Sequence, residues 1–179
     1  MLCICAALAA ADLPADVSVT IATRQAALLV QDTPFAPALQ LLNELQLGIG
    51  LRPGVGPIAG IRAGAGVGVG YVGASRMLGG YRYRGLVTRN LWISGGWSFA
   101  SGLRLTGTGR AALASYELTS LVFSYAEIEL AAGLTTIIGR AARIEWSIPF
   151  FYQFRHDVDY AAGVGLRGAF ALEFSSPRP

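Results

Sequence analysis

Few side chains of this sequence could act as an acid, a base or a nucleophile. It has one histidine, two cysteines (Cys3 and Cys5) and no lysine. His156 stands beside Asp157 and Asp159, and a lipid hydrolase or acyltransferase would need such a histidine with a serine or aspartate in reach. The His-Asp-Val-Asp stretch is equally typical of a turn, and no nucleophile with positional support accompanies it. We therefore expect no catalytic residue, no metal site and no cofactor.

A second chemically capable set consists of arginines and glutamates that share one parity of alternating segments. If that parity is buried, these charges must be paired or hydrated. A symmetric turn near Leu118 would place Arg110 across from Glu127, and a three-residue turn at 157–159 would place Arg143 opposite Glu173. The set either fills the interior with salt bridges or lines and gates a narrow passage. It comprises Arg62, Arg104, Arg110, Glu127, Glu129, Arg143, Glu145, Arg167 and Glu173.

Three aromatic residues, Trp92, Phe123 and Phe151, share the same inward parity. They would suit the path of a small hydrophobic solute, and they would serve equally well as packing.

The segment Tyr160–Phe174 shows most clearly which element positions such residues. Every second residue is large and apolar or aromatic over most of its length, and the residues between are mostly Gly and Ala, with Arg167 and Glu173. This alternation is typical of a strand with two different environments on its faces. Small and charged residues suit a narrow barrel lumen, and an apolar opposite face suits lipid.

The same pattern recurs along the chain and predicts an all-β fold, an eight-stranded antiparallel up-and-down transmembrane β-barrel. Two points stay open: 38–47 also fits a helical period, and 88–90 is either a turn or part of a strand that projects beyond the bilayer. Pro149 cannot donate to a ladder, so we expect a bulge there. The expected strands cover 17–31, 39–52, 58–72, 81–99, 103–115, 122–138, 143–155 and 160–174.

Composition supports this interpretation. Hydrophobic residues make up 53% of the chain and charged residues 14%, well below the roughly 25% of a soluble domain. No run approaches the ~20 apolar residues of a spanning helix. The net charge of +3 is too small and too dispersed for a nucleic-acid partner. A soluble lipocalin-like barrel would need polar outward faces, and these are apolar.

The hairpin Leu45-Gln-Leu-Gly-Ile-Gly-Leu-Arg-Pro-Gly-Val-Gly-Pro-Ile-Ala-Gly-Ile and the last two strands resemble the OmpW-like group, within the wider OmpA/OmpX-type small outer-membrane barrels. The resemblance implies a location in the bacterial cell outer membrane, lipid and the assembly machinery as partners, and a monomer. It also implies a narrow channel for small, hydrophobic solutes. The alternative is a closed structural or adhesive barrel that presents surface loops without transport. Such barrels usually end on an aromatic residue, whereas here Phe174 is followed by Ser-Ser-Pro-Arg-Pro.

Three regions are expected along the chain. Residues 1–15 resemble the latter part of a signal peptide without its positive region. Residues 16–174 form the barrel, and residues 175–179 form a short polar tail. Short turns near Pro53, Ser101 and Gly139 would face the periplasm, and the loops near Asp32, Gly73, Tyr116 and His156 would face outward.

Overall fold

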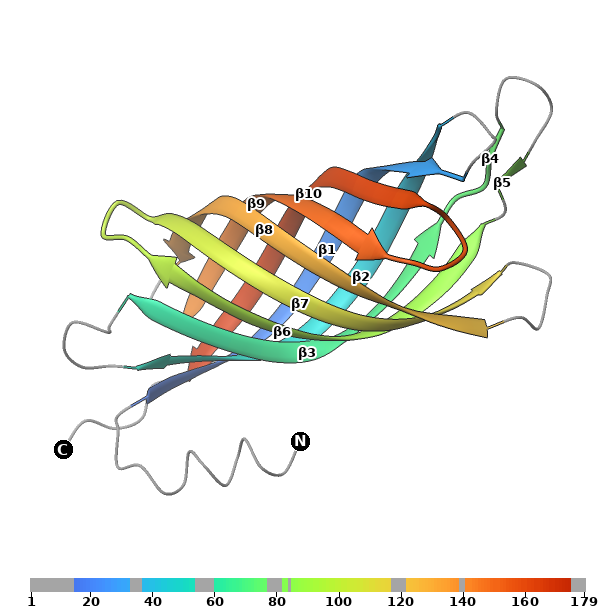
Figure 1. Ribbon diagram of the computed structural model, residues 1–179. Helices are drawn as coiled ribbons and strands as arrows, with labels where there is room; N and C mark the ends of the chain where they lie inside the picture. The colour runs from blue at the N-terminus through green and yellow to red at the C-terminus, as the bar shows by residue number, and fades with distance from the viewer. Residues whose placement is uncertain are drawn as a thin grey trace, which may run out of the picture.

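The computed structural model describes residues 15–32, 37–53, 60–76, 82–83, 85–116, 122–138 and 141–174. Eight long strands form a closed antiparallel barrel in the order β1-β10-β9-β8-β7-β6-β3-β2, and β4 and β5 pair separately (Figure 1). The predicted all-β, eight-stranded up-and-down barrel is therefore confirmed. The elements are β1 (Ala15–Gln31), β2 (Ala38–Pro53), β3 (Ile61–Val72), β4 (Ser75–Arg76), β5 (Arg82–Tyr83), β6 (Leu86–Ser98), β7 (Leu103–Tyr116), β8 (Val122–Ile138), β9 (Ala142–Phe154) and β10 (Tyr160–Phe174).

Two ambiguous segments are strands. Residues 38–47 belong to β2, which pairs with β1 along its length. Residues 88–90 lie within β6, where Arg89 pairs with Val69 and with Leu113 and points outward. The helical and turn alternatives are therefore wrong, because both neighbouring strands hold these residues in register.

The predicted strand over 81–99 is too long. The barrel strand β6 begins at Leu86, and residues 82–83 form β5, which pairs with β4 outside the barrel. Residues 82–83 of the predicted strand therefore belong to a separate two-stranded sheet. Figure 1 shows β4 and β5 beyond the end of the barrel that lies opposite to the start of β1 and the end of β10.

Pro149 does not cause the predicted bulge. The register between β8 and β9 is constant from Ala126 opposite Phe154 to Ile138 opposite Ala142, and it includes Ala131 opposite Pro149. On the other side, β10 pairs with β9 before and after this point in one register, with no pair at Gly165 or Leu166. The missing N–H thus falls where the ladder is interrupted.

The two faces of the wall differ as the alternation predicts. Outward residues are apolar and exposed on every long strand, as with Leu41, Leu91, Leu130 and Phe150. Inward residues include fully buried arginines, glutamates and glutamines. No helix among the described residues is long and apolar enough to cross a membrane. An apolar exterior around a polar interior is the reverse of a soluble fold, and it identifies the outer surface as the one that meets lipid.

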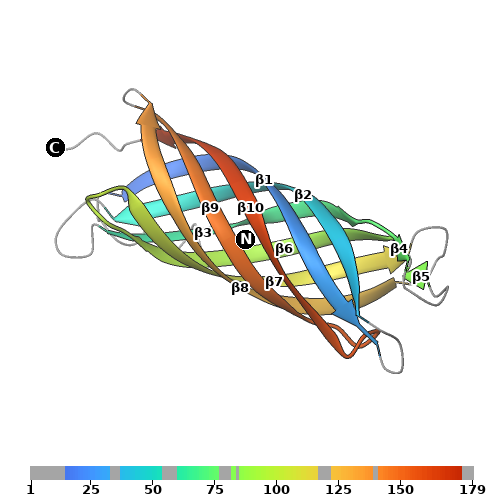
Figure 2. The ribbon, with the colours of Figure 1, turned by 90° about the horizontal axis from the view of Figure 1, so that it is seen from above.

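The first and last strands close the barrel. Val17 at the start of β1 pairs with Phe174 at the end of β10, so both lie at the same end of the barrel. The connection 99–102, the end of β8 at Ile138 and the start of β9 at Ala142 lie at this end (Figure 2). The expected signal-peptide segment, apart from Ala15, and the tail 175–179 lie outside the described residues.

Candidate functional site

The barrel interior contains a central layer of ion pairs. Arg24 on β1 contributes Nη1, which lies 2.6 Å from Glu127 Oε1 and 2.8 Å from Glu129 Oε2. Arg110 on β7 places its own Nη1 at the same two distances from the same two oxygens. Two guanidinium groups therefore share two carboxylates of β8, and all four side chains are buried. We call these residues, together with Glu44, the central cluster.

Glu44 extends the central cluster to the opposite wall. Its Oε2 lies 2.7 Å from Arg24 Nη2, and its Oε1 accepts hydrogen bonds from Gln46 Nε2 at 2.9 Å and Asn90 Nδ2 at 3.0 Å. Gln153 Nε2 donates to Glu127 at 2.9 Å. The donors and acceptors come from six strands around the ring. The central cluster therefore braces the lumen across its width.

An apolar layer lies on the side of the central cluster away from Val17 and Phe174. Its members are buried side chains that inward parity brings together at this end of the long strands, with Val158 from the connection 155–159. This layer leaves the outer half of the barrel packed, like the core of a small domain. It includes Leu28, Val30, Leu42, Val72, Leu86, Ala112, Ala114, Phe123, Tyr125, Phe151, Val158 and Ala161.

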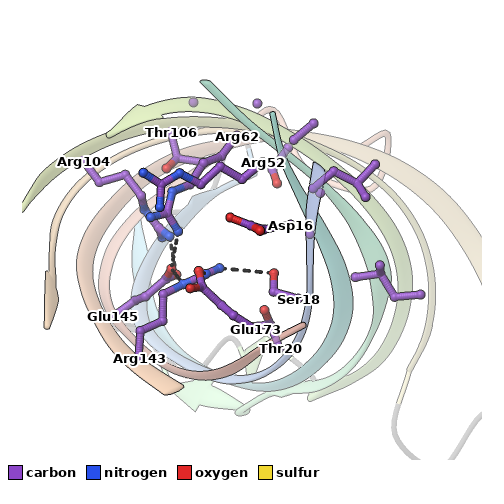
Figure 3. A pocket seen from close by; sticks show the side chains of 18 of the residues that line it. Asp16, Ser18, Thr20, Arg52, Arg62, Arg104, Thr106, Arg143, Glu145 and Glu173 are labelled. Atoms are coloured by element: carbon purple, nitrogen blue, oxygen red, sulfur yellow. Dashed lines mark hydrogen bonds and ion pairs between the residues drawn. The ribbon is translucent and has the colours of Figure 1, made fainter. Parts of the chain in front are cut away.

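A second group of charges lies at the end of the barrel where Val17 of β1 and Phe174 of β10 pair, and Figure 3 shows its side chains. Glu145 pairs with Arg104, with Arg143 Nε at 2.6 Å and with Arg62 Nη1 at 3.5 Å. Arg143 also pairs with Glu173 and donates to Ser18 Oγ at 3.2 Å. One carboxylate thus serves three guanidinium groups. These residues line a cavity of about 60 Å³, which we call the end cavity.

The predicted lumen aromatics are buried and lie against arginines. The guanidinium carbon of Arg24 lies 4.6 Å from the ring centre of Phe151, and that of Arg155 lies 5.5 Å from Phe123. Trp92 has the guanidinium of Arg167 at 5.8 Å. Such contacts are favourable between a cation and an aromatic face. The three rings are therefore packed in the interior as partners of the arginines.

All nine charged residues singled out in the sequence have side chains on the inner face. The ladder places Arg110 directly opposite Glu127. Arg143 lies opposite Ala171 rather than Glu173, because the connection 155–159 is centred on Asp157 and the predicted turn 157–159 on Val158. The ion pair with Glu173 still forms, since diagonal neighbours lie within reach of a long side chain.

The charged set predicted from the sequence lacks Arg24 and Glu44. Both stand at inward positions of their strands, and this alternation is the one feature of the sequence that could have identified them. Glu44 lies directly opposite Arg24 in the β1–β2 ladder.

His156 takes no part in an acid–base arrangement among the described residues. It is exposed, with its ring 5.3 Å from Phe123. The neighbouring Asp157 accepts hydrogen bonds from Arg155 Nε at 2.9 Å and Tyr116 Oη at 2.7 Å. Burial alone would raise the pKa of Asp157, but Arg155 and Tyr116 outweigh burial and hold that pKa below its usual value. Within the described residues, no group of three or more His, Cys, Asp or Glu side chains could hold a metal ion.

The structure resembles solved outer-membrane barrels, although no family model and no curated protein sequence matches the chain. Neisserial surface protein A superposes with a TM-score of 0.57 at 13% identity, covering 88% of this chain and 97% of that one. For Ail, the attachment invasion locus protein of Yersinia pestis, solved with the heparin analogue sucrose octasulfate, the TM-score is 0.52 at 13% identity, over 90% and 100%. For the outer membrane protein AlkL in lipid bilayers, it is 0.51 at 12% identity, over 93% and 92%.

These similarities define the class of fold: a small eight-stranded β-barrel of the bacterial outer-membrane type. The apolar outer belt agrees with that fold and supports the predicted outer-membrane location. They show the wider group of small outer-membrane barrels and do not test the specific OmpW likeness.

Proposed function

We propose that this protein is an outer-membrane barrel with a closed lumen, which anchors and presents its outer connections and holds no standing pore. The observation that carries the proposal is the central cluster. Its charged side chains come from β1, β2, β7 and β8 and meet in the middle of the lumen. A lumen of eight strands is just wide enough for such a filling.

The apolar layer supports the same proposal. Leu28, Val30 and Ala161 have no exposed surface, and Leu42, Val72 and Leu86 have almost none. A solute that entered from the outer end would meet this packed layer first and the central cluster next. A water-filled path would have to displace both layers.

The β4–β5 pair, which lies outside the barrel sheet, supports a presenting role. It belongs to the segment between β3 and β6, which has more residues than any other connection between barrel strands. Figure 1 shows β4 and β5 at the end of the barrel where β3 ends and β6 begins. In such barrels the short turns face the periplasm and the longer loops face outward. The proposed outward side is therefore the side of β4 and β5.

A second candidate function is gated passage of small, hydrophobic solutes. The favouring observation is that several polar atoms of the central layer, including Gln46 Oε1, Asn90 Oδ1, Thr108 Oγ1 and Glu129 Oε1, have no hydrogen-bond partner among the described residues. A partly satisfied network is less stable than a fully satisfied one. Such a layer could rearrange when a solute or a voltage acts on it.

Solute flux into proteoliposomes tests the proposal. We expect small sugars and small hydrophobic probes to enter vesicles that hold the refolded protein no faster than protein-free vesicles. The variant Arg24→Ala/Glu127→Ala removes one cation and one anion together, so the charge balance of the central cluster is kept while space is created. Rapid entry through the wild-type protein would overturn the closed-lumen proposal and favour the second candidate.

A further inference from the structure

We propose that the end cavity is a binding site for a small oxyanion such as inorganic phosphate. It lies at the end of the barrel where the strand ends Val17 and Phe174 meet. Its volume of about 60 Å³ has room for roughly four water-sized groups, since a single water needs about 15 Å³ by this measure. A small tetrahedral or carboxylate anion fits this space, whereas a sugar or a lipid tail does not.

The charge of the lining favours an anion. Five arginines and three carboxylates line the end cavity, which leaves an excess of two positive charges: Arg52, Arg62, Arg104, Arg143 and Arg167 against Asp16, Glu145 and Glu173. In Figure 3, Arg52, Arg62 and Arg104 converge from one side on the region that Glu145 and Glu173 face from the other. Arginine forks match the geometry of phosphate and carboxylate oxygens.

Arg167 provides an independent observation. Its side chain is 7% exposed, yet its guanidinium makes no ion pair with a described carboxylate, and its Nε has no hydrogen-bond partner among the described residues. Its contact is with the ring of Trp92. A buried arginine without a counter-ion is unfavourable. An anion in the end cavity would supply the missing charge.

Arg62 shows the same deficit more mildly. Its link to Glu145 spans 3.5 Å, and its buried Nε also lacks a hydrogen-bond partner in the described part of the chain. Glu145 already serves Arg104 and Arg143. Two arginines of the end cavity are therefore only partly neutralised, and both line the same space.

The contact between Arg167 and Trp92 makes the site observable. The chain has three tryptophans, and the other two, Trp97 and Trp146, are exposed on the outer surface. The background variant Trp97→Phe/Trp146→Phe therefore leaves Trp92 as the single reporter. We would titrate the refolded protein in detergent with inorganic phosphate, at constant ionic strength maintained with chloride, and follow the fluorescence of Trp92.

We expect saturable quenching or a spectral shift, and we expect Arg167→Gln to weaken phosphate binding at least tenfold. Arg89→Gln is the matched control, because Arg89 points outward from β6, and it should leave binding unchanged. Arg62→Gln, in the lining of the end cavity, should weaken phosphate binding severalfold. This variant tests the site if Arg167→Gln does not refold.

Three results would overturn the site. One is an absence of any saturable response in the background variant. Another is equal phosphate affinity in the Arg167→Gln, Arg62→Gln and Arg89→Gln proteins. The third is a response that chloride alone reproduces at the same concentration. The phosphate site could exist whether or not the lumen is closed. Solute flux tests the closed lumen and phosphate affinity tests the site, so the two proposals can fail independently.

Discussion

Arg24 and Glu127 form a buried ion pair that joins β1 to β8 across the barrel, with Nη1 and Oε1 2.6 Å apart. Two strands, β10 and β9, separate them around the wall. The pair is therefore a cross-brace of the lumen. Because Arg110 shares the same carboxylate oxygen, removing either arginine leaves glutamates buried with too little positive charge.

The first prediction concerns this brace. Arg24→Ala leaves Glu44, Glu127 and Glu129 with Arg110 as their remaining partner in the central cluster, and removing one member of a buried ion pair costs about 3–5 kcal/mol. We expect a loss of that size in the free energy of unfolding, measured by urea titration in lipid vesicles. Arg89→Ala, on the outer face, should be neutral or stabilising. Equal effects of the two substitutions would contradict the brace.

The second prediction concerns the space that glycines leave for Trp92. A Cβ on Gly66 would collide with the Trp92 ring and with the backbone oxygen of Leu47, whereas a Cβ on Gly95 would meet no atom within 4 Å. Gly66→Ala should therefore destabilise the barrel by about 1–3 kcal/mol, as overpacking usually does. Gly95→Ala should change the unfolding free energy by less than about 0.5 kcal/mol. The same urea titrations compare them, and an undisturbed Gly66→Ala barrel would refute this packing.

The third prediction concerns pH and Asp157. Because Arg155 and Tyr116 lower the pKa of Asp157 in the folded protein, its carboxylate stabilises the fold above its usual pKa of 3.8. That contribution is lost as the pH falls through the lowered folded-state pKa. The difference in urea midpoint between wild type and Asp157→Asn should be clear at pH 7 and should shrink below pH 3.8. Tyr116→Phe should reduce the difference at pH 7, and a difference that grows in acid would exclude this linkage.

The fourth prediction concerns orientation. In a background of Cys3→Ser and Cys5→Ser, Ala74→Cys next to β4 should react with a membrane-impermeant maleimide on intact cells. Ser101→Cys, an exposed residue between β6 and β7 at the opposite end of the barrel, is the matched control. It should react only after the outer membrane is permeabilised. The reverse labelling pattern would invert the proposed orientation.

The fold could be predicted from the sequence because each long strand has two different environments. The period of two then determines which residues face lipid and which face the lumen. On β8, for example, Leu130 faces outward and its neighbour Glu129 faces the lumen. The same rule could not exclude residues 82–83 from the barrel, because alternation in a sequence does not distinguish a barrel strand from a strand of a separate sheet. The bulge expected at Pro149 is absent, because β9 keeps one constant register with β8 and one with β10.

The central cluster could be predicted only in part. Arg110 and Glu127 are ladder neighbours, so a turn position was enough to pair them. Arg24 reaches Glu129 across two intervening strands, and that contact depends on the stagger of every register around the ring. Local sequence patterns do not determine the sum of the register shifts between successive strands. The free charge of Arg167 likewise becomes visible only when the whole lining of the end cavity is assembled.

Single-channel conductance in planar bilayers tests the closed lumen most directly. The wild-type protein should insert as β-sheet and show no discrete openings at moderate voltage. Arg24→Ala/Glu127→Ala, which removes the cross-brace at constant net charge, should stay silent as long as the apolar layer is packed, and adding Leu28→Ala and Leu42→Ala should produce small discrete openings, because both layers can then hydrate. Regular discrete openings of the wild-type protein would contradict a lumen closed by the central cluster and the apolar layer.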